Sequence, residues 1–98
     1  SEKEKVDKAI ELYQKGEYQK AIDAFSSVLE TCADNAELYN NIALCYANLK
    51  DYDKAEKNYL RALELNPRLP QVYINLSDIY YRDRDMGKGI ELVSRGIL

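Results

Sequence analysis

Three successive copies of one pattern make up this chain of 98 residues. Sliding the sequence against itself by 34 residues aligns similar residues along the whole chain, without an insertion. The aligned sets are Ala9, Ala43 and Ser77; Tyr18, Tyr52 and Met86; Ala21, Ala55 and Gly89; Phe25, Tyr59 and Val93; and Leu29, Leu63 and Ile97. A repeat of this length indicates one small structural unit per copy, stacked on its neighbours to bury a continuous core.

Each copy contains two stretches of helical periodicity. In the second copy, apolar residues such as Leu38, Ile42 and Cys45 recur three and four positions apart. Gly16 marks a turn at which the first helix must stop, and Lys50 with Asp51 marks the corresponding turn of the second copy less clearly. Asp51 also suits the start of a helix, where an acidic residue favours the dipole. Pro67 marks another stop because its ring removes a backbone donor. The expected helices cover about 3–15, 18–31, 36–49, 52–65, 70–83 and 86–97.

The second copy also carries a set of aromatic, small and proline residues at fixed spacing. These residues are Tyr39, Ile42, Ala43, Tyr46, Ala55, Tyr59 and Pro67. The set resembles the tetratricopeptide repeat, whose pattern is Trp-x2-Leu-Gly-x2-Tyr, then Ala-x3-Phe, then Pro. Tyr39 stands where the family has Trp, and Ile42 with Ala43 stands where it has Leu-Gly. Three copies in phase make the resemblance specific, and it covers essentially the whole chain.

The resemblance implies an all-α fold, a right-handed α-α superhelix of about six antiparallel helices. It implies a single domain, 1–98, with repeats at 2–35, 36–69 and 70–98, the last one truncated. Small residues are expected where the two helices of a pair cross, because they let the backbones approach closely. The small residues at these crossings are Ala9, Ala43 and Ser77 on one side, and Ala21, Ala55 and Gly89 on the other.

The pattern weakens at both ends of the chain. Lys5 and Lys8 occupy positions where the family favours Trp and Leu, as expected of a terminal repeat whose outer face meets water. The last expected helix contains three glycines, so we expect it to be the least stable. Its apolar face has no cover within the chain, and it consists of Ile90, Val93 and Ile97. We expect either a fragment of a longer protein or a homo-oligomer that pairs through residues 86–98.

Charge and composition argue against several classes of function. The net charge is −3 and no Lys/Arg-rich run is present, so neither nucleic acid nor an anionic membrane surface is an expected partner. No apolar run is long enough to span a bilayer, and the N-terminus does not read as a signal peptide, so a cytoplasmic location is favoured. The chain has no histidine and no glycine-rich phosphate loop, so we expect neither an enzyme nor a bound cofactor.

The two cysteines, Cys32 and Cys45, do not have the spacing of a metal or redox site. Without histidine a zinc site would also lack ligands, so no metal is expected. Both cysteines are expected to act as small buried or half-buried hydrophobes. A disulfide is the alternative.

The resemblance further implies which residues face the concave side of the solenoid. Carried over position by position, they are Lys3, Val6, Asp7, Ile10, Tyr13, Gln14, Glu37, Asn40, Asn41, Leu44, Ala47, Asn48, Gln71, Ile74, Asn75, Asp78, Tyr81 and Arg82. Charges of both signs are mixed in this set, and its apolar members would form a stripe of the kind that marks binding sites. The alternative for Ile10 and Leu44 is a place in the core between neighbouring helices.

Two asparagines are the most specific members of this set. Asn41 and Asn75 occupy the same position in successive repeats, and an amide can pair with both the C=O and the N–H of a peptide backbone. This is similar to the asparagine ladder of the O-GlcNAc transferase repeats, with Asp7 in place of the first rung. The alternative is that both are ordinary solvated polar residues.

A second family function is argued against at the same positions. Co-chaperone members hold a terminal carboxylate with Lys, Asn and Arg side chains. The corresponding residues here are Val6, Ile10, Asn41, Gln71 and Asn75, of which only Asn41 matches. A carboxylate needs nearby positive charge, so we expect no useful binding of heat-shock-protein tails.

Two functions therefore remain for this chain. The first is a protein–protein interaction module that binds a peptide or helix of a partner protein in its concave groove. The alternative is a self-assembly or scaffold unit that pairs through its uncapped last helix. The fold alone does not name the partner.

Overall fold

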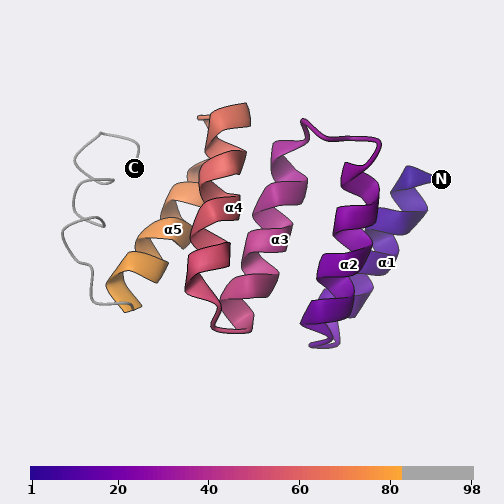
Figure 1. Cartoon of the computed structure of the whole chain (residues 1–98), viewed down its shortest axis with the longest axis horizontal. Helices are drawn as coiled ribbons and strands as arrows, with labels where there is room; N and C mark the ends of the chain where they lie inside the picture. The colour runs from indigo at the N-terminus through magenta and orange to yellow at the C-terminus, as the bar shows by residue number, and fades with distance from the viewer. Residues whose placement is uncertain (83–98) are drawn as a thin grey trace.

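The computed structural model describes residues 1–82, which form five α-helices in a row (Figure 1). The helices are α1 (Glu2–Gln14), α2 (Tyr18–Leu29), α3 (Ala36–Asn48), α4 (Tyr52–Leu65) and α5 (Pro70–Arg82). Each bound lies within two residues of the range predicted from the periodicity, so the all-α prediction is confirmed. The predicted helix at 86–97, its three glycines and the proposed pairing through residues 86–98 lie outside the described residues.

The helices are arranged as successive antiparallel pairs. Each helix packs against its neighbour in sequence, and α3 also touches α5 across the intervening α4. In Figure 1 the row runs from α1, which lies behind α2, through α3 and α4 to α5. Contacts limited to near neighbours are the mark of a repeat solenoid, and this arrangement is an α-α superhelix.

Side-chain caps set where three of the helices begin. The side chain of Ser1 accepts a hydrogen bond from the amide of Glu4, and that of Asn35 accepts from the amides at the start of α3. Asp51 accepts from the amide of Lys54 at the start of α4. Such caps satisfy amides that have no partner within the helix. The prediction that Asp51 suits a turn and a helix start is confirmed.

Two turns between paired helices use a left-handed backbone. Gly16, between α1 and α2, has φ of 80°, and Lys50, between α3 and α4, has φ of 64°. The two residues occupy the same position in successive repeats. Glycine adopts this conformation freely, whereas a side chain crowds the following carbonyl. The second repeat therefore makes the same turn at a cost in conformational free energy, which the glycine of the first repeat avoids.

The core consists of two clusters that meet at α3. One cluster packs α1, α2 and α3 around Phe25, and the other packs α3, α4 and α5 around Tyr59. Four of the five small residues predicted at the crossings within residues 1–82 are buried there, and Ser77 is half-buried. Ala9, Ala21, Ala43 and Ala55 are fully buried, with no exposed surface. Within the described residues the buried set contains no charged side chain.

Ser77 is the exception among the small residues at the crossings. Its hydroxyl oxygen is buried and has no hydrogen-bond partner within residues 1–82. The aligned residues of the first two repeats are alanines, which bring no polar atom into the crossing. The third repeat therefore carries an unsatisfied buried hydroxyl at this point.

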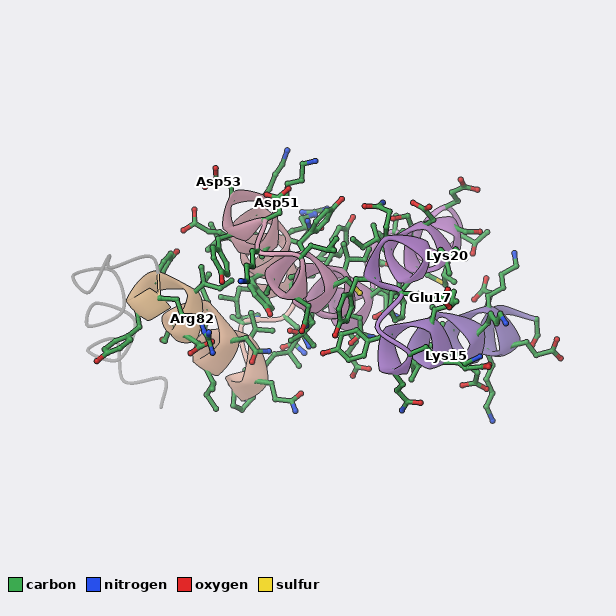
Figure 2. The ribbon with its side chains drawn as sticks, turned by 90° about the horizontal axis from the view of Figure 1, so that it is seen from below. Lys15, Glu17, Lys20, Asp51, Asp53 and Arg82 are labelled. Atoms are coloured by element: carbon green, nitrogen blue, oxygen red, sulfur yellow. The ribbon has the colours of Figure 1, made fainter. Side chains whose placement is uncertain are left out.

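Charged side chains gather near the turns and helix ends, where Figure 2 labels Lys15, Glu17, Lys20, Asp51, Asp53 and Arg82. Lys15 pairs with Glu11 at 2.9 Å, and Lys20 pairs with Glu17 at 3.2 Å, each within its own helix or helix end. Exposed pairs of this kind stabilise a fold by no more than about 1 kcal/mol. We therefore attribute the fold to its apolar clusters rather than to these ion pairs.

Candidate functional site

None of the residues predicted to face the concave side is buried. Each of them is exposed or half-buried, including Ile10 and Leu44, for which a place in the core was the alternative. Most of them line three adjoining hollows formed by α1, α3 and α5, the first helices of the three repeats. The predicted residues that line none of the three hollows are Lys3, Val6, Asp7, Ile74 and Tyr81.

The α1–α3 hollow has a volume of about 270 Å³ and is mainly apolar. Phe25 of α2 contributes to this hollow from the core, whereas the other lining residues were all predicted from the repeat positions. The complete lining is Ile10, Tyr13, Gln14, Phe25, Asn41 and Leu44. A hollow of this composition suits a bulky apolar side chain.

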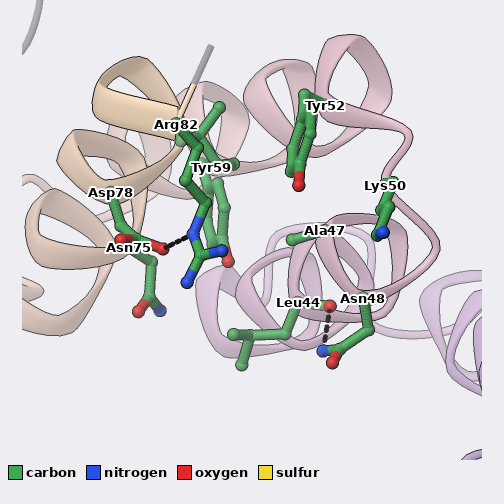
Figure 3. Close-up of a pocket in the computed structure, with 10 residues that line it drawn as sticks. Leu44, Ala47, Asn48, Lys50, Tyr52, Tyr59, Asn75, Asp78 and Arg82 are labelled. Carbon is green, nitrogen blue, oxygen red and sulfur yellow. Dashed lines mark hydrogen bonds and ion pairs between the residues drawn. The ribbon is translucent and has the colours of Figure 1, made fainter. Parts of the chain in front are cut away.

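The α3–α5 hollow has a volume of about 290 Å³ and is more polar (Figure 3). Its lining is Leu44, Ala47, Asn48, Lys50, Tyr52, Tyr59, Asn75, Asp78, Ile79 and Arg82. Figure 3 shows Lys50 and Arg82 on opposite sides of this hollow. Leu44 lines both this hollow and the α1–α3 hollow, so its side chain is the partition between them.

A third, smaller hollow lies at the other end of α3 and has a volume of about 210 Å³. It is lined by Glu37, Asn40, Asn41, Leu69, Gln71 and Val72. Asn41 lines both this hollow and the α1–α3 hollow. The three hollows therefore form a continuous series in which Asn41 and Leu44 are the shared walls.

The two asparagines of the predicted ladder differ in their surroundings. Asn75 lines the α3–α5 hollow, and its amide donates a long hydrogen bond of 3.5 Å to the side-chain oxygen of Asn40. The side chain of Asn41 has no hydrogen-bond partner within residues 1–82. Each amide thus keeps at least one N–H for a ligand, although the two line different hollows.

The ionic groups of the α3–α5 hollow are unequally paired. Nε of Arg82 donates to Oδ2 of Asp78 at 2.8 Å, so these two charges neutralise each other. The ammonium of Lys50 forms no ion pair within the described part of the chain. Tyr59 lines the hollow although its side chain is almost fully buried, and burial raises the pKa of its phenol, with Tyr13 and Asp78 adding to the rise.

Three lining residues of the α3–α5 hollow come from outside the first helices and were not predicted from the sequence. Lys50 lies in a turn, whereas Tyr52 and Tyr59 belong to α4. The carried-over family positions lie on α1, α3 and α5, so these residues could not appear among them. Tyr59 did carry a signal, because it stands where the family pattern has Phe. A hydroxyl on a core ring must reach a polar partner or water, and here it lies beside a hollow.

The two thiols are free. Cys45 is fully buried, and burial raises its pKa to about 11. Cys32 is half-buried, and its Sγ donates to Oε2 of Glu2 at 3.0 Å, which raises the pKa of the thiol. Both cysteines are therefore the small buried or half-buried residues that the sequence predicted.

The described residues contain neither a candidate metal site nor a membrane-spanning helix. No group of three or more Cys, Asp and Glu side chains that could hold a metal ion occurs between residues 1 and 82. None of the helices there combines the length and hydropathy needed to cross a bilayer.

Helix pairs stacked in a row, with hollows along the face formed by the first helices, define a helical repeat protein. Comparison with protein families gives two matches. The family model described as "Tetratricopeptide repeat" matches residues 36–69, and the one described as "TPR repeat" matches residues 9–50. The chain belongs to the tetratricopeptide repeat family.

Relatives of this chain include two kinds of longer protein, one named as a member of a complex and one named as an assembly protein. The chain is 30% identical over 86 residues to the BBSome complex member BBS4 of Bos taurus, covering 88% of this chain and 16% of that protein. It is 35% identical over 69 residues to the photosystem I assembly protein Ycf3 of Synechococcus elongatus, covering 67% of this chain and 40% of that protein. The chain thus spans well under half of either relative.

Solved structures share the fold at lower identity. The second TPR of Spaghetti (RPAP3), bound to the HSP90 peptide SRMEEVD, superposes with a TM-score of 0.87 at 18% identity. The match covers 95% of this chain and 86% of that one. Two domains of yeast Sti1 that share the fold are likewise solved as a pHSP90 complex and a pHsp70 complex.

Proposed function

We propose that this chain is a non-catalytic protein–protein interaction module that holds a segment of a partner protein along its concave face. The observation that carries the proposal is the continuous series of three hollows, which share Asn41 and Leu44 as walls. An open series of small hollows, with both polar and apolar lining, suits successive side chains of one bound segment.

The solved peptide complexes of the same fold support this proposal. The similarity to the HSP90-peptide complex concerns the fold, because the identity is 18%. The residues at the family's carboxylate-holding positions differ here. Val6, Ile10 and Gln71 carry no charge at those positions. The partner is therefore not a heat-shock-protein tail held by its terminal carboxylate.

Asn41 and Asn75 are proposed to hold the backbone of the bound segment. Each amide offers a donor and an acceptor, and a peptide backbone offers both in return. Hydrogen bonds to the backbone do not depend on the side chains of the ligand, so they would supply affinity while the hollows select the sequence. The side chain of Asn41, which is unpaired within residues 1–82, and its place between two hollows support this role.

The test is a selection from a displayed library of random peptides on the purified chain. The same selection is repeated on the double variant Asn41→Ala/Asn75→Ala, after circular dichroism has shown that the variant is folded. We expect peptides that are enriched on the natural chain and lost on the variant. Equal enrichment on both proteins would reject the role of the two amides, and no enrichment on either would reject groove binding.

A further inference from the structure

A strained lysine beside the concave face indicates what kind of segment binds there. Lys50 lines the α3–α5 hollow and has the left-handed φ of 64°, where the first repeat has Gly16. An L-residue is disfavoured in this conformation. Strained residues of this kind cluster at functional sites, so Lys50 is a candidate for direct contact with a ligand in the hollow.

The charge of the α3–α5 hollow is positive overall. Its only carboxylate among the described residues, Asp78, is neutralised by Arg82 at 2.8 Å, and Lys50 has no acidic partner within residues 1–82. One positive charge is therefore left over on a chain whose net charge is −3. An anionic group would complement it, and a cationic group would be repelled.

The hydrogen-bonding groups around this hollow also favour an acceptor. The Arg82 side chain uses Nε for Asp78, which leaves its terminal nitrogens as donors beside the hydroxyl of Tyr59 (Figure 3). Tyr52 adds a second hydroxyl from α4. Asn48 supplies no donor, because its amide already donates to the backbone oxygen of Leu44 at 2.8 Å and to the hydroxyl of Tyr13.

The adjoining α1–α3 hollow has the opposite chemistry. Ile10, Tyr13, Phe25 and Leu44 give it apolar walls, and no charged side chain lines it. Leu44 separates the two hollows, so a single bound segment would meet both. The face thus offers one apolar hollow and one hollow with excess positive charge, side by side.

We propose that the partner segment carries an aspartate or glutamate side chain for the α3–α5 hollow and a bulky apolar side chain for the α1–α3 hollow. The inference depends on the proposed function, because it names the chemistry of the segment held there. The carboxylate belongs to a side chain within the segment. It is met by Lys50 from a turn, with Arg82 and two tyrosine hydroxyls around it.

Three displayed peptide libraries test this inference. Each library contains a fixed leucine among random residues, and the libraries differ in a second fixed residue at varied distances from it, which is glutamate, glutamine or lysine. Enrichment is measured on the natural chain and on Lys50→Gln, Lys50→Arg and Lys57→Gln. Lys57 is the matched control, since it is an exposed lysine of α4 that lines none of the three hollows.

We expect the natural chain to prefer the glutamate library about fivefold over the glutamine library, the upper end for an exposed ion pair. The lysine library should be the least enriched. Lys50→Gln should abolish this preference, whereas Lys50→Arg and Lys57→Gln should keep it. The preference should also weaken as the salt concentration rises, because exposed charges are screened.

Two outcomes would overturn the inference, and they differ in what they say of the proposed function. Equal enrichment of the glutamate and glutamine libraries would reject the carboxylate, and a glutamate preference unchanged in Lys50→Gln would reject Lys50 as the residue that meets it. Either result would leave a groove that binds peptides. If no library were enriched, both the carboxylate inference and the proposed binding of peptides in the groove would be rejected.

Discussion

The side-chain amide of Asn48 donates a hydrogen bond of 3.3 Å to the hydroxyl of Tyr13, which lies 35 residues earlier. This bond links α3 to α1. Asn75 donates to Asn40 across the same separation of 35 residues and links α5 to α3. Each bond spans one residue more than the repeat length, so both join neighbouring positions on successive first helices. Polar pairs at this offset therefore help to set how the helices that line the concave face lie against one another.

The Asn48–Tyr13 bond can be measured with a double-mutant cycle of Tyr13→Phe and Asn48→Ala. We expect a coupling of about 0.5–1 kcal/mol in the free energy of unfolding, typical of a neutral hydrogen bond. Urea unfolding of the four proteins gives this number. A coupling of zero would mean that the bond does not persist in solution.

Asn58→Ala is the matched control for this cycle. The amide of Asn58 donates to the backbone oxygen of Lys54 at 2.8 Å, as that of Asn48 does to Leu44, and no second helix is involved. Combined with Tyr13→Phe, it should give additive effects, because the two side chains share no partner.

The helices could be predicted from the sequence because local signals and repeat packing agree. Apolar spacing, Gly16, Asp51 and Pro67 each indicated the correct helix or turn, and three copies in phase repeated the signal. The left-handed turn at Lys50 was predicted less clearly, since lysine gives no such signal. There the packing of α3 against α4 imposes a conformation that the residue itself disfavours.

The candidate site was predicted in part. Repeat positions placed residues such as Asn41, Leu44 and Asn75 beside hollows, because a solenoid presents the same positions in each copy. They did not reveal the contributions of Lys50 and Tyr59, which depend on how closely α4 approaches the face. That distance depends on how the helices pack, and the repeat pattern in the sequence does not give it.

The left-handed turns predict opposite effects of glycine in the two repeats. Gly16→Ala should destabilise the chain by about 1 kcal/mol, although an added Cβ would meet no atom within 4 Å, because the backbone itself disfavours a side chain there. Lys50→Gly should stabilise it by up to about 1 kcal/mol for the same reason. Thermal unfolding of both variants checks the pair. A loss of stability in Lys50→Gly would contradict the strain assigned to that turn.

The crossing of α3 and α4 predicts a cost for added volume. Ala55 is fully buried, so Ala55→Leu should overpack the crossing and lower the free energy of unfolding by about 1–3 kcal/mol. Ala47, which is half-buried on the concave side of α3, provides the control. Ala47→Leu can extend into the adjacent hollow and should cost less. An unchanged melting curve for Ala55→Leu would argue against this packing.

The unsatisfied hydroxyl of Ser77 predicts a stabilising substitution. Ser77→Ala removes a buried oxygen that has no partner within residues 1–82 and restores the alanine of the other two repeats. The free energy of unfolding should rise by about 1 kcal/mol, the lower end of the penalty for a buried unpaired group. Ser27→Ala, at an exposed position of α2, should change it little. A loss of stability in Ser77→Ala would show that the hydroxyl has a partner after all.

Alkaline pH should destabilise the chain through Cys45. Burial raises the pKa of this thiol from 9.0 to about 11, so between these values the unfolded chain releases a proton that the folded chain keeps. The unfolded state then binds fewer protons, and stability falls as pH rises from about 9 to about 11. Below pH 9 the contribution is fully present. Urea unfolding across this range measures the slope.

Cys45→Ala separates this thiol from the other groups that titrate in alkali. The variant should be less stable at neutral pH, because a buried side chain becomes smaller, yet its stability should fall less steeply between pH 9 and 11. Tyr59, whose pKa is also raised by burial from its ordinary value of 10.0, remains in the variant and lowers the stability of both proteins from about pH 10 upward. Equal slopes for the two proteins would show that Cys45 is not protected from ionisation by the contact of α3 with α1 and α2.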